Sequence, residues 1–366
     1  MRYVRMPIEV ESPEEYGYDA IRYNLSESSI ADQSLSSLGL TIPDLTLLYT
    51  EHRGARRLRE LVVAGTAGLD ADHVLITAGA AGALFIVATA LLTAEDHLVV
   101  VRPNYATNLE TPRAIGCDIG FVDLAFEHGF QIDLDAIAAA ITPRTRLISV
   151  TCPHNPTGVA ASEAQLSALA DLAAERGCRL LVDETYGDLA YDGALPIAAA
   201  LGPHVISVAS LSKAYGVPGI RIGWLVCRDP ALQELFLAAK EQIGICGSVI
   251  DEWIAEQVLA RRAALLQPTL AEMRRRRDRV AAWIQGEPLL EWVRPTGGVV
   301  CFPRMTGEPP GGTEGFYKRL LETYGTYVGP GHWFEQSDRY FRLGYGWPTA
   351  EALDGGLEAI SRALRG

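Results

Sequence analysis

A lysine among small hydroxyl residues is the side chain of this sequence best suited to covalent chemistry. Lys213 follows an apolar run in SVASLSKAYGVPGIRIGW (residues 207–224), with Ser210 and Ser212 just before it and Arg221 eight positions later. Partial burial lowers the pKa of such an amine and frees it to attack a carbonyl and form an imine. The serines and the arginine would supply donors and positive charge to a phosphate group. Taken alone, the segment is equally compatible with a loop lysine that meets only solvent.

A carboxylate at the end of an apolar run is the second candidate. Asp183 ends LLVD in LLVDETYGDLAYDG, where burying an unpaired carboxylate is costly. A protonated pyridine nitrogen would meet that charge and make the ring an electron sink for a carbanion at a substrate Cα. Tyr186 would then donate a hydrogen bond to the phenolic oxygen of the ring. A helix-capping aspartate with a packed tyrosine stays open as the alternative.

Two turns between a strand and a helix carry further candidates. The Asn-Pro-Thr-Gly turn in SVTCPHNPTG would fix Asn155 beside the same phenolic oxygen. In TAGAAGAL (77–84), the amides near Gly79, Ala80 and Ala81 would meet a phosphate at a helix N-terminus. An ordinary turn is the alternative for the first, and small-residue packing is the alternative for the second.

Seven short β-rich runs must position these side chains. Between Val74 and Cys227, VLIT, HLVVV, IGFVDL, RLISVT, RLLVDE, VISVAS and IGWLVC are separated mostly by helix-length stretches. This alternation predicts a largely parallel sheet with helices on both faces, which carries its chemistry at the carboxyl ends of the strands. The Ala- and Gly-rich stretch 78–93 is short for a membrane span and is predicted to be a buried helix.

The pattern changes after the sheet region. Helices are expected at 230–243, 248–284 and 350–364, with a break or kink at Pro268. The strand-like LEWVRP, GGVVCFPR, YGTYVGP and YFRLGY lie between the last two helices. The sequence therefore predicts an α/β fold with a large domain at 45–245 and a smaller α+β domain formed by 1–44 and 246–366.

The composition is that of an acidic globular protein. A formal charge of −13 argues against nucleic acid as a partner. The six cysteines are far apart and show no spacing typical of zinc or of a redox dithiol, so no metal is expected. The N-terminus turns acidic and has no apolar signal core, so a cytoplasmic protein without membrane attachment is expected.

The joint order of the motifs carries a specific resemblance. TAGAAGAL, RPNYA, CPHNPTG, VDETY, SLSKAYGVPGIR and FRLGY, from about Tyr49 to Arg342, strongly resemble the class I/II aminotransferases of PLP fold type I. The resemblance implies pyridoxal 5′-phosphate (PLP) as the cofactor, a mostly parallel seven-stranded sheet between helices, and an amino acid as the substrate. The lysine motif and length also resemble the natural-product branch of capreomycidine synthase-type cyclases and PLP-dependent amino-acid oxidases and lyases.

The resemblance implies roles for the matching residues. Lys213 would be the Schiff-base lysine and general acid/base, and Asp183 would pair with the pyridine nitrogen. The other implied cofactor contacts are Asn155 and Tyr186 at the phenolic oxygen, Tyr105 of RPNYA on the ring face, and Ser210, Arg221 and the amides near Ala80 and Ala81 at the phosphate. Arg342 would bind the substrate α-carboxylate as a bidentate guanidinium. Tyr49 would reach the phosphate of a neighbouring subunit, which implies a homodimer.

One segment departs from the family pattern. Where many members have a glycine-containing turn, this chain has YNLSESSIAD with Glu27. Glu27 would pair with a cationic substrate group or move a proton, and a helix-capping or surface glutamate stays open as the alternative. His332, Trp333 and Cys246 are further pocket candidates, although packing is favoured for the cysteine.

Three functions follow from these residues. The first is an aminotransferase in which Lys213 moves the Cα proton and a keto acid is the amino acceptor. The second keeps PLP for elimination, oxidation, decarboxylation or cyclisation of a specialised amino acid in natural-product biosynthesis, and Glu27 motivates it. The third, a ligand-sensing domain, is disfavoured because no segment has the length or basicity of a DNA-binding module.

Overall fold

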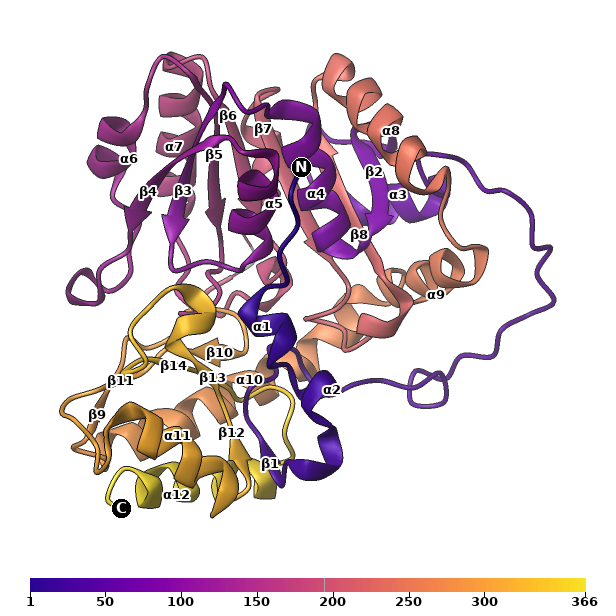
Figure 1. The fold of residues 1–366 in the computed structure, drawn as a ribbon. Coiled ribbons are helices and arrows are strands. Elements are labelled where there is room, and N and C mark those ends of the chain that lie inside the picture. The colour runs from indigo at the N-terminus through magenta and orange to yellow at the C-terminus, as the bar shows by residue number, and fades with distance from the viewer. Residues whose placement is uncertain (194) are drawn as a thin grey trace.

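A seven-stranded mixed sheet forms the centre of the larger lobe of the computed structural model, which describes residues 1–193 and 195–366 (Figure 1). In spatial order its strands are β2 (Val74–Ala78), β8 (Ile222–Cys227), β7 (Val205–Ser210), β6 (Arg179–Asp183), β5 (Thr145–Thr151), β3 (His97–Arg102) and β4 (Asp118–Asp123). Strand β8 runs antiparallel to β2 and β7, and the other neighbours pair in parallel. The predicted mostly parallel seven-stranded sheet is confirmed.

Alternating side chains of strand β3 enter two separate cores on the two faces of the sheet. Val99 and Val101 of β3 belong to the core that includes α6 (Leu134–Ala140) and α7 (Glu163–Glu175). Leu98 and Val100 belong to the core of α4 (Gly79–Leu91) and α8 (Pro230–Gly244), next to which α5 (Thr107–Ile115) lies. Strands buried on both faces read as continuous apolar runs, which explains why HLVVV was recognisable. Within residues 1–193 and 195–366, every helix is too short or too polar to cross a membrane.

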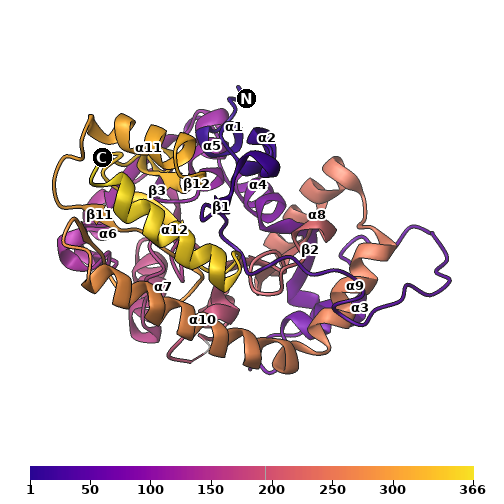
Figure 2. The ribbon, with the colours of Figure 1, turned by 90° about the horizontal axis from the view of Figure 1, so that it is seen from below.

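The smaller lobe combines short strands with three helices. Its strands are β9 (Leu290–Glu291), β10 (Val300–Cys301), β11 (Arg304–Met305), β12 (Thr326–Tyr327), β13 (Gly329–Pro330) and β14 (Phe341–Gly344), and its helices are α10 (Arg262–Gln285), α11 (Gly312–Glu322) and α12 (Ala350–Ala363). Helices α10 and α12 are seen along this lobe in Figure 2. Helix α9 (Val249–Leu259) precedes α10 and packs on α3 (Arg56–Val62).

The break expected at Pro268 is wrong. Pro268 lies inside α10, and the chain instead leaves the helical path at Ala260 and Arg261, between α9 and α10. A proline within a helix removes one backbone hydrogen bond but need not end the helix when packing holds both sides. Contacts of α10 with α9 and α12 supply that packing.

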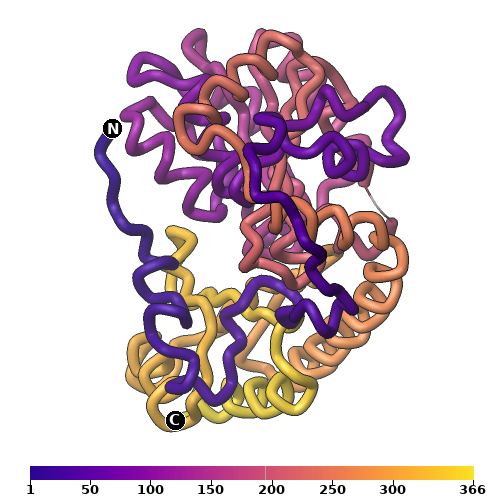
Figure 3. Tube along the Cα trace, turned by 90° about the vertical axis from the view of Figure 1, so that its right-hand side faces the viewer, coloured from indigo at the N-terminus to yellow at the C-terminus, as the bar shows by residue number. Residues whose placement is uncertain are grey.

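The N-terminal segment, residues 1–29, runs from the sheet lobe to the smaller lobe (Figures 1 and 3). It contains α1 (Pro7–Val10), α2 (Pro13–Tyr16) and β1 (Tyr23–Asn24), which pairs in parallel with β12. The Gly344 amide donates to the Leu25 carbonyl at 2.7 Å. A Cβ on Gly344 would lie 1.8 Å from the Glu27 carbonyl oxygen, so only glycine allows this approach. The segment is thereby held against the end of β14.

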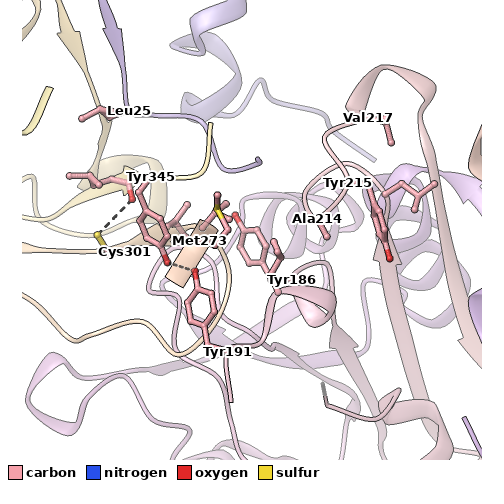
Figure 4. Close-up of a cluster of buried hydrophobic side chains, with 14 of the residues drawn as sticks. Leu25, Tyr186, Tyr191, Ala214, Tyr215, Val217, Met273, Cys301 and Tyr345 are labelled. Carbon is pink, nitrogen blue, oxygen red and sulfur yellow. Dashed lines mark hydrogen bonds between the residues drawn. The ribbon is translucent and has the colours of Figure 1, made fainter. Parts of the chain in front are cut away.

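Buried tyrosines join the two lobes next to Tyr186 (Figure 4). The hydroxyls of Tyr191 and Tyr345 lie 3.0 Å apart, and Tyr191 donates to the Gly298 carbonyl at 2.6 Å. A Cβ on Gly298, whose φ is +71°, would come within 3.3 Å of the Tyr186 ring. Met273 of α10 belongs to the same core. The close contact between Gly298 and the Tyr186 ring therefore fixes Tyr186 relative to both lobes.

Candidate active site

One cavity of about 270 Å³ brings together most of the residues singled out from the sequence. Its lining includes Glu27, Ala80, Ala81, Tyr105, Asn155, Asp183, Tyr186, Ser210, Ser212, Lys213, Arg221 and Arg342. Asp183 and Ser210 are the last residues of β6 and β7, so neighbouring strand ends deliver them to one edge of the sheet. The roles of these residues toward a cofactor or a substrate stay predictions.

The N-terminus of α4 forms a site suited to an anion. Gly79 begins the helix with φ +71°, and a Cβ there would lie 2.6 Å from Nη2 of Arg221. The Arg221 guanidinium therefore lies directly against the first turn, beside amides that have no partner within the helix. Ser210 and Ser212 line the same cavity. These donors fit the phosphate that the sequence motifs predict.

Asp183 is buried, and its hydrogen-bond donors among the described residues are neutral. Its side chain is 4% exposed, and Oδ1 accepts from the backbone N–H of Thr185 at 3.0 Å and from its hydroxyl at 2.6 Å. Burial raises the pKa of the Asp183 carboxyl, and the hydrogen bonds from Thr185 act in the opposite direction. A cation placed in the cavity would favour the ionised form, so this position fits a protonated pyridine nitrogen.

The amine of Lys213 contacts the N-terminal segment. Nζ donates to Oγ of Ser28 at 3.0 Å, and Tyr186 donates its hydroxyl proton to the Ser28 carbonyl at 2.7 Å. Burial, followed by the neighbouring Arg342 guanidinium, lowers the pKa of Lys213. Burial raises the pKa of Tyr186 to about 12, which keeps its phenol protonated. Lys213 is therefore a more available nucleophile and base than an exposed lysine.

Arg342 is a buried guanidinium with one nitrogen free. It is 4% exposed and donates from Nη1 to Oδ1 of Asn155 at 3.2 Å and from Nη2 to the Ser26 carbonyl at 2.8 Å. Its Nε has no hydrogen-bond partner among the described residues. An orphaned buried donor that lines a cavity is costly unless a ligand satisfies it. A carboxylate is the ligand that a guanidinium accommodates best.

Glu27 is neither a helix cap nor an isolated surface residue. It is half-buried in the cavity lining, and Oε1 accepts from the Tyr18 hydroxyl at 3.0 Å and from Nδ2 of Asn24 at 3.4 Å. Burial first, and then the charge of Glu14, raise the pKa of the Glu27 carboxyl. Its placement keeps both predicted roles open, namely pairing with a cationic substrate group and proton transfer.

The other sequence candidates lie elsewhere, with one exception. Trp333 lines the cavity, whereas the neighbouring His332 is exposed and contacts Glu11 and Asp338. Cys246 does not line the cavity. Tyr49 is 78% exposed in the long connection before α3, and its donation across a dimer interface stays a prediction. The described residues contain no group of three His, Cys, Asp or Glu side chains that could hold a metal ion.

Sequence reasoning missed the acidic residues that the N-terminal segment adds to the cavity. Glu9 and Glu14 line it together with Ser12, and Glu9 accepts a hydrogen bond of 3.3 Å from the Tyr105 hydroxyl. Helices α1 and α2 are four residues long, too short to show a helical period. The available signal was the density of acidic residues in IEVESPEEY, which was interpreted only as evidence against a signal peptide.

Comparison with known proteins gives a consistent result. Residues 44–360 match the family described as aminotransferase class I and II. Capreomycidine synthase of Streptomyces vinaceus is 35% identical over 314 residues, covering 85% of this chain and 79% of that protein. Arginine–pyruvate transaminase AruH of Pseudomonas aeruginosa is 34% identical over 314 residues, covering 81% and 77%. The solved PLP-dependent cyclase OrfR superposes with a TM-score of 0.88 at 29% identity, over 100% of this chain and 98% of that one.

Proposed function

The chain belongs to the class I and II aminotransferase family, and from that premise we propose that it transfers the amino group of an amino acid to a keto acid. Its fold is PLP fold type I and its cofactor is PLP, which when bound supplies an electron sink for the substrate Cα. One observation carries the proposal: the amine of Lys213 shares a cavity with the buried carboxylate of Asp183 and the unsatisfied guanidinium of Arg342.

Each side chain of the cavity would have its own role in this reaction. Arg342 binds the substrate α-carboxylate, and this fixes the substrate Cα in the cavity that Lys213 lines. Nζ of Lys213, which its surroundings hold closer to neutrality, removes the Cα proton and keeps it for the second proton transfer. Asp183 holds the pyridine nitrogen, Asn155 and Tyr186 hold the phenolic oxygen, and Arg221 with the first turn of α4 holds the phosphate.

The direct test is a spectrum of the PLP-loaded protein during titration with a panel of amino acids, with and without 2-oxoglutarate or pyruvate. A transaminase should show a cofactor absorbance change with a suitable amino acid that recovers only when a keto acid is added. Ammonia and peroxide are assayed in parallel. Sustained turnover that releases either product without a keto acid would contradict transamination.

A second reaction class is favoured by a specific observation. Capreomycidine synthase and the PLP-dependent cyclase OrfR are both similar to the chain over most of its length, and Glu27 adds a carboxylate that can move a proton in the cavity. Cyclisation, elimination, oxidation or decarboxylation of a specialised amino acid would begin at the same Cα. A new product formed in the absence of any keto acid, and identified by mass spectrometry, would establish this second class.

A further inference from the structure

The cavity contains more carboxylates than its expected cofactor would pair with. Its cationic side chains are Lys213, Arg221 and Arg342. Arg221 lies at the phosphate site and Lys213 provides the reactive amine, so Arg342 is the cation left for the substrate. Asp183 is taken by the pyridine nitrogen. Three further carboxylates, Glu9, Glu14 and Glu27, form what we call the carboxylate cluster, and nothing in the cofactor is complementary to them.

The described partners of the cavity-facing carboxylates Glu9 and Glu27 are neutral. Glu27 accepts from Tyr18 and Asn24, and Glu9 accepts from Tyr105. Glu14 lies close enough to Glu27 for its charge to raise the pKa of the Glu27 carboxyl. Like charges in a partly buried site disfavour one another unless a cation is placed between them. The charges of Lys213 and Arg342 act on the Glu27 pKa in the opposite direction, and a cationic ligand between Glu14 and Glu27 would add to them.

Arg342 requires a ligand group of the opposite charge, an anion. Arg342 lines the same cavity, and its buried Nε has no hydrogen-bond partner among the described residues. A ligand that satisfies both places must carry a carboxylate at one end and a positive charge at the other. This second observation is independent of the acidic cluster and points to a ligand in its own right.

The shape of the site also favours a substrate with a long side chain. A second cavity of about 480 Å³ shares Glu14, Glu27 and Lys213 with the first and continues past Tyr18 to Asp32. Glu14 and Glu27 therefore border both spaces. A long side chain that extends from a Cα near Lys213 can therefore bring its end beside these two carboxylates.

We propose that the substrate is an amino acid with a long cationic side chain, a guanidinium or a primary amine, whose charge is bound between Glu14 and Glu27 while Arg342 binds its α-carboxylate. This inference rests on the proposed function and names the substrate class of the same site. Selection operates through binding, because a neutral side chain of equal length gains no attraction from Glu14 and from the half-buried Glu27.

Isosteric pairs test the charge requirement. The PLP-loaded enzyme is titrated with arginine and citrulline, and with lysine and 2-aminoheptanoic acid, and dissociation constants are read from the cofactor absorbance. The wild type should bind the cationic member of at least one pair about tenfold or more tightly than the neutral member. Glu27→Gln should reduce that preference about tenfold, mainly through weaker binding of the cationic member.

Two further variants separate charge recognition from folding. Glu14→Gln alters an exposed residue of α2 and should reduce the same preference. Glu15→Gln is the matched control on the same helix, because Glu15 faces Arg5 at 3.5 Å and does not line the cavity. Equal affinity for the cationic and neutral members of both pairs in the wild type would overturn the substrate class and leave the proposed function standing. An absence of any spectral response to every amino acid of the broad panel would instead overturn the proposed function.

Discussion

The two ends of the cavity are built in different ways. The predicted cofactor end, formed by Ala80, Asp183, Ser210, Lys213 and Arg221, comes from the first turn of α4, the ends of β6 and β7 and the connection between β7 and β8, all in the sheet lobe. The substrate end combines the N-terminal segment with Trp333 and Arg342 of the smaller lobe, more than 300 residues away in sequence. A two-residue pairing of β1 with β12 and single hydrogen bonds hold it together. The two ends meet at Ser28, which accepts hydrogen bonds from Lys213 and Tyr186.

Lys213→Ala tests the cofactor end and should give the largest effect. Loss of the general acid/base is expected to lower turnover by roughly 10²–10⁴-fold, and the absorbance of the imine with the lysine should disappear with it. Activity assays and an absorbance spectrum on the same preparation measure both. Lys318→Ala, which changes an exposed lysine of α11, is the control. Near-normal turnover in Lys213→Ala would remove the basis of the proposed function.

Arg342→Gln should act mainly at the substrate end, although Arg342 also donates a hydrogen bond to Asn155. Removing the guanidinium that would bind a buried carboxylate costs about 2 kcal/mol or more, so amino acid substrates should bind roughly 30-fold more weakly. The cofactor absorbance without substrate should stay as in the wild type. Circular dichroism checks that the variant folds, because Arg342 is buried. A variant that folds but no longer holds PLP would show that the two ends are not separable.

The difference between the two ends of the cavity also explains how much of the fold and of the site could be predicted from the sequence. The strands of the sheet were predictable because side chains buried on both faces leave long apolar runs, and Asp183 and Lys213 lie within short contiguous motifs at the ends of such runs. Strands such as β9 and β13 are two residues long and carry no period of their own. Glu9 and Glu14 meet the cavity only because tertiary contacts fold the N-terminal segment across it.

Two adjacent residues at the substrate end also show what could not be predicted from the sequence alone. His332 and Trp333 were equal candidates in the sequence, but the structure turns the tryptophan toward the cavity and the histidine toward Asp338. A 3₁₀ turn at Gly331–Phe334 sets that difference, and no local pattern revealed it. Glu27 was recognised as a departure from the family, yet its partners Tyr18 and Asn24 depend on how the segment folds back.

The attachment of the N-terminal segment should depend on pH, and this is the smallest effect we expect. His332 contacts Asp338 at 2.9 Å and Glu11, which follows α1, at 2.8 Å; these bonds raise the pKa of His332 to about 9. Because this value is above the usual one near 6.5, the stabilisation is complete below about pH 6.5 and is lost as the pH rises through about 9.

Thermal unfolding of the wild type and of His332→Ala at pH 6 and at pH 9.5 measures this contribution. Exposed ion pairs contribute up to about 1 kcal/mol, so the variant should unfold about 1–2 °C lower at pH 6 and at nearly the wild-type temperature at pH 9.5. His128→Ala, at an exposed histidine of the sheet lobe, is the control. An equal difference at both pH values would mean that His332 stabilises the segment by packing, because loss of its charge would then change nothing.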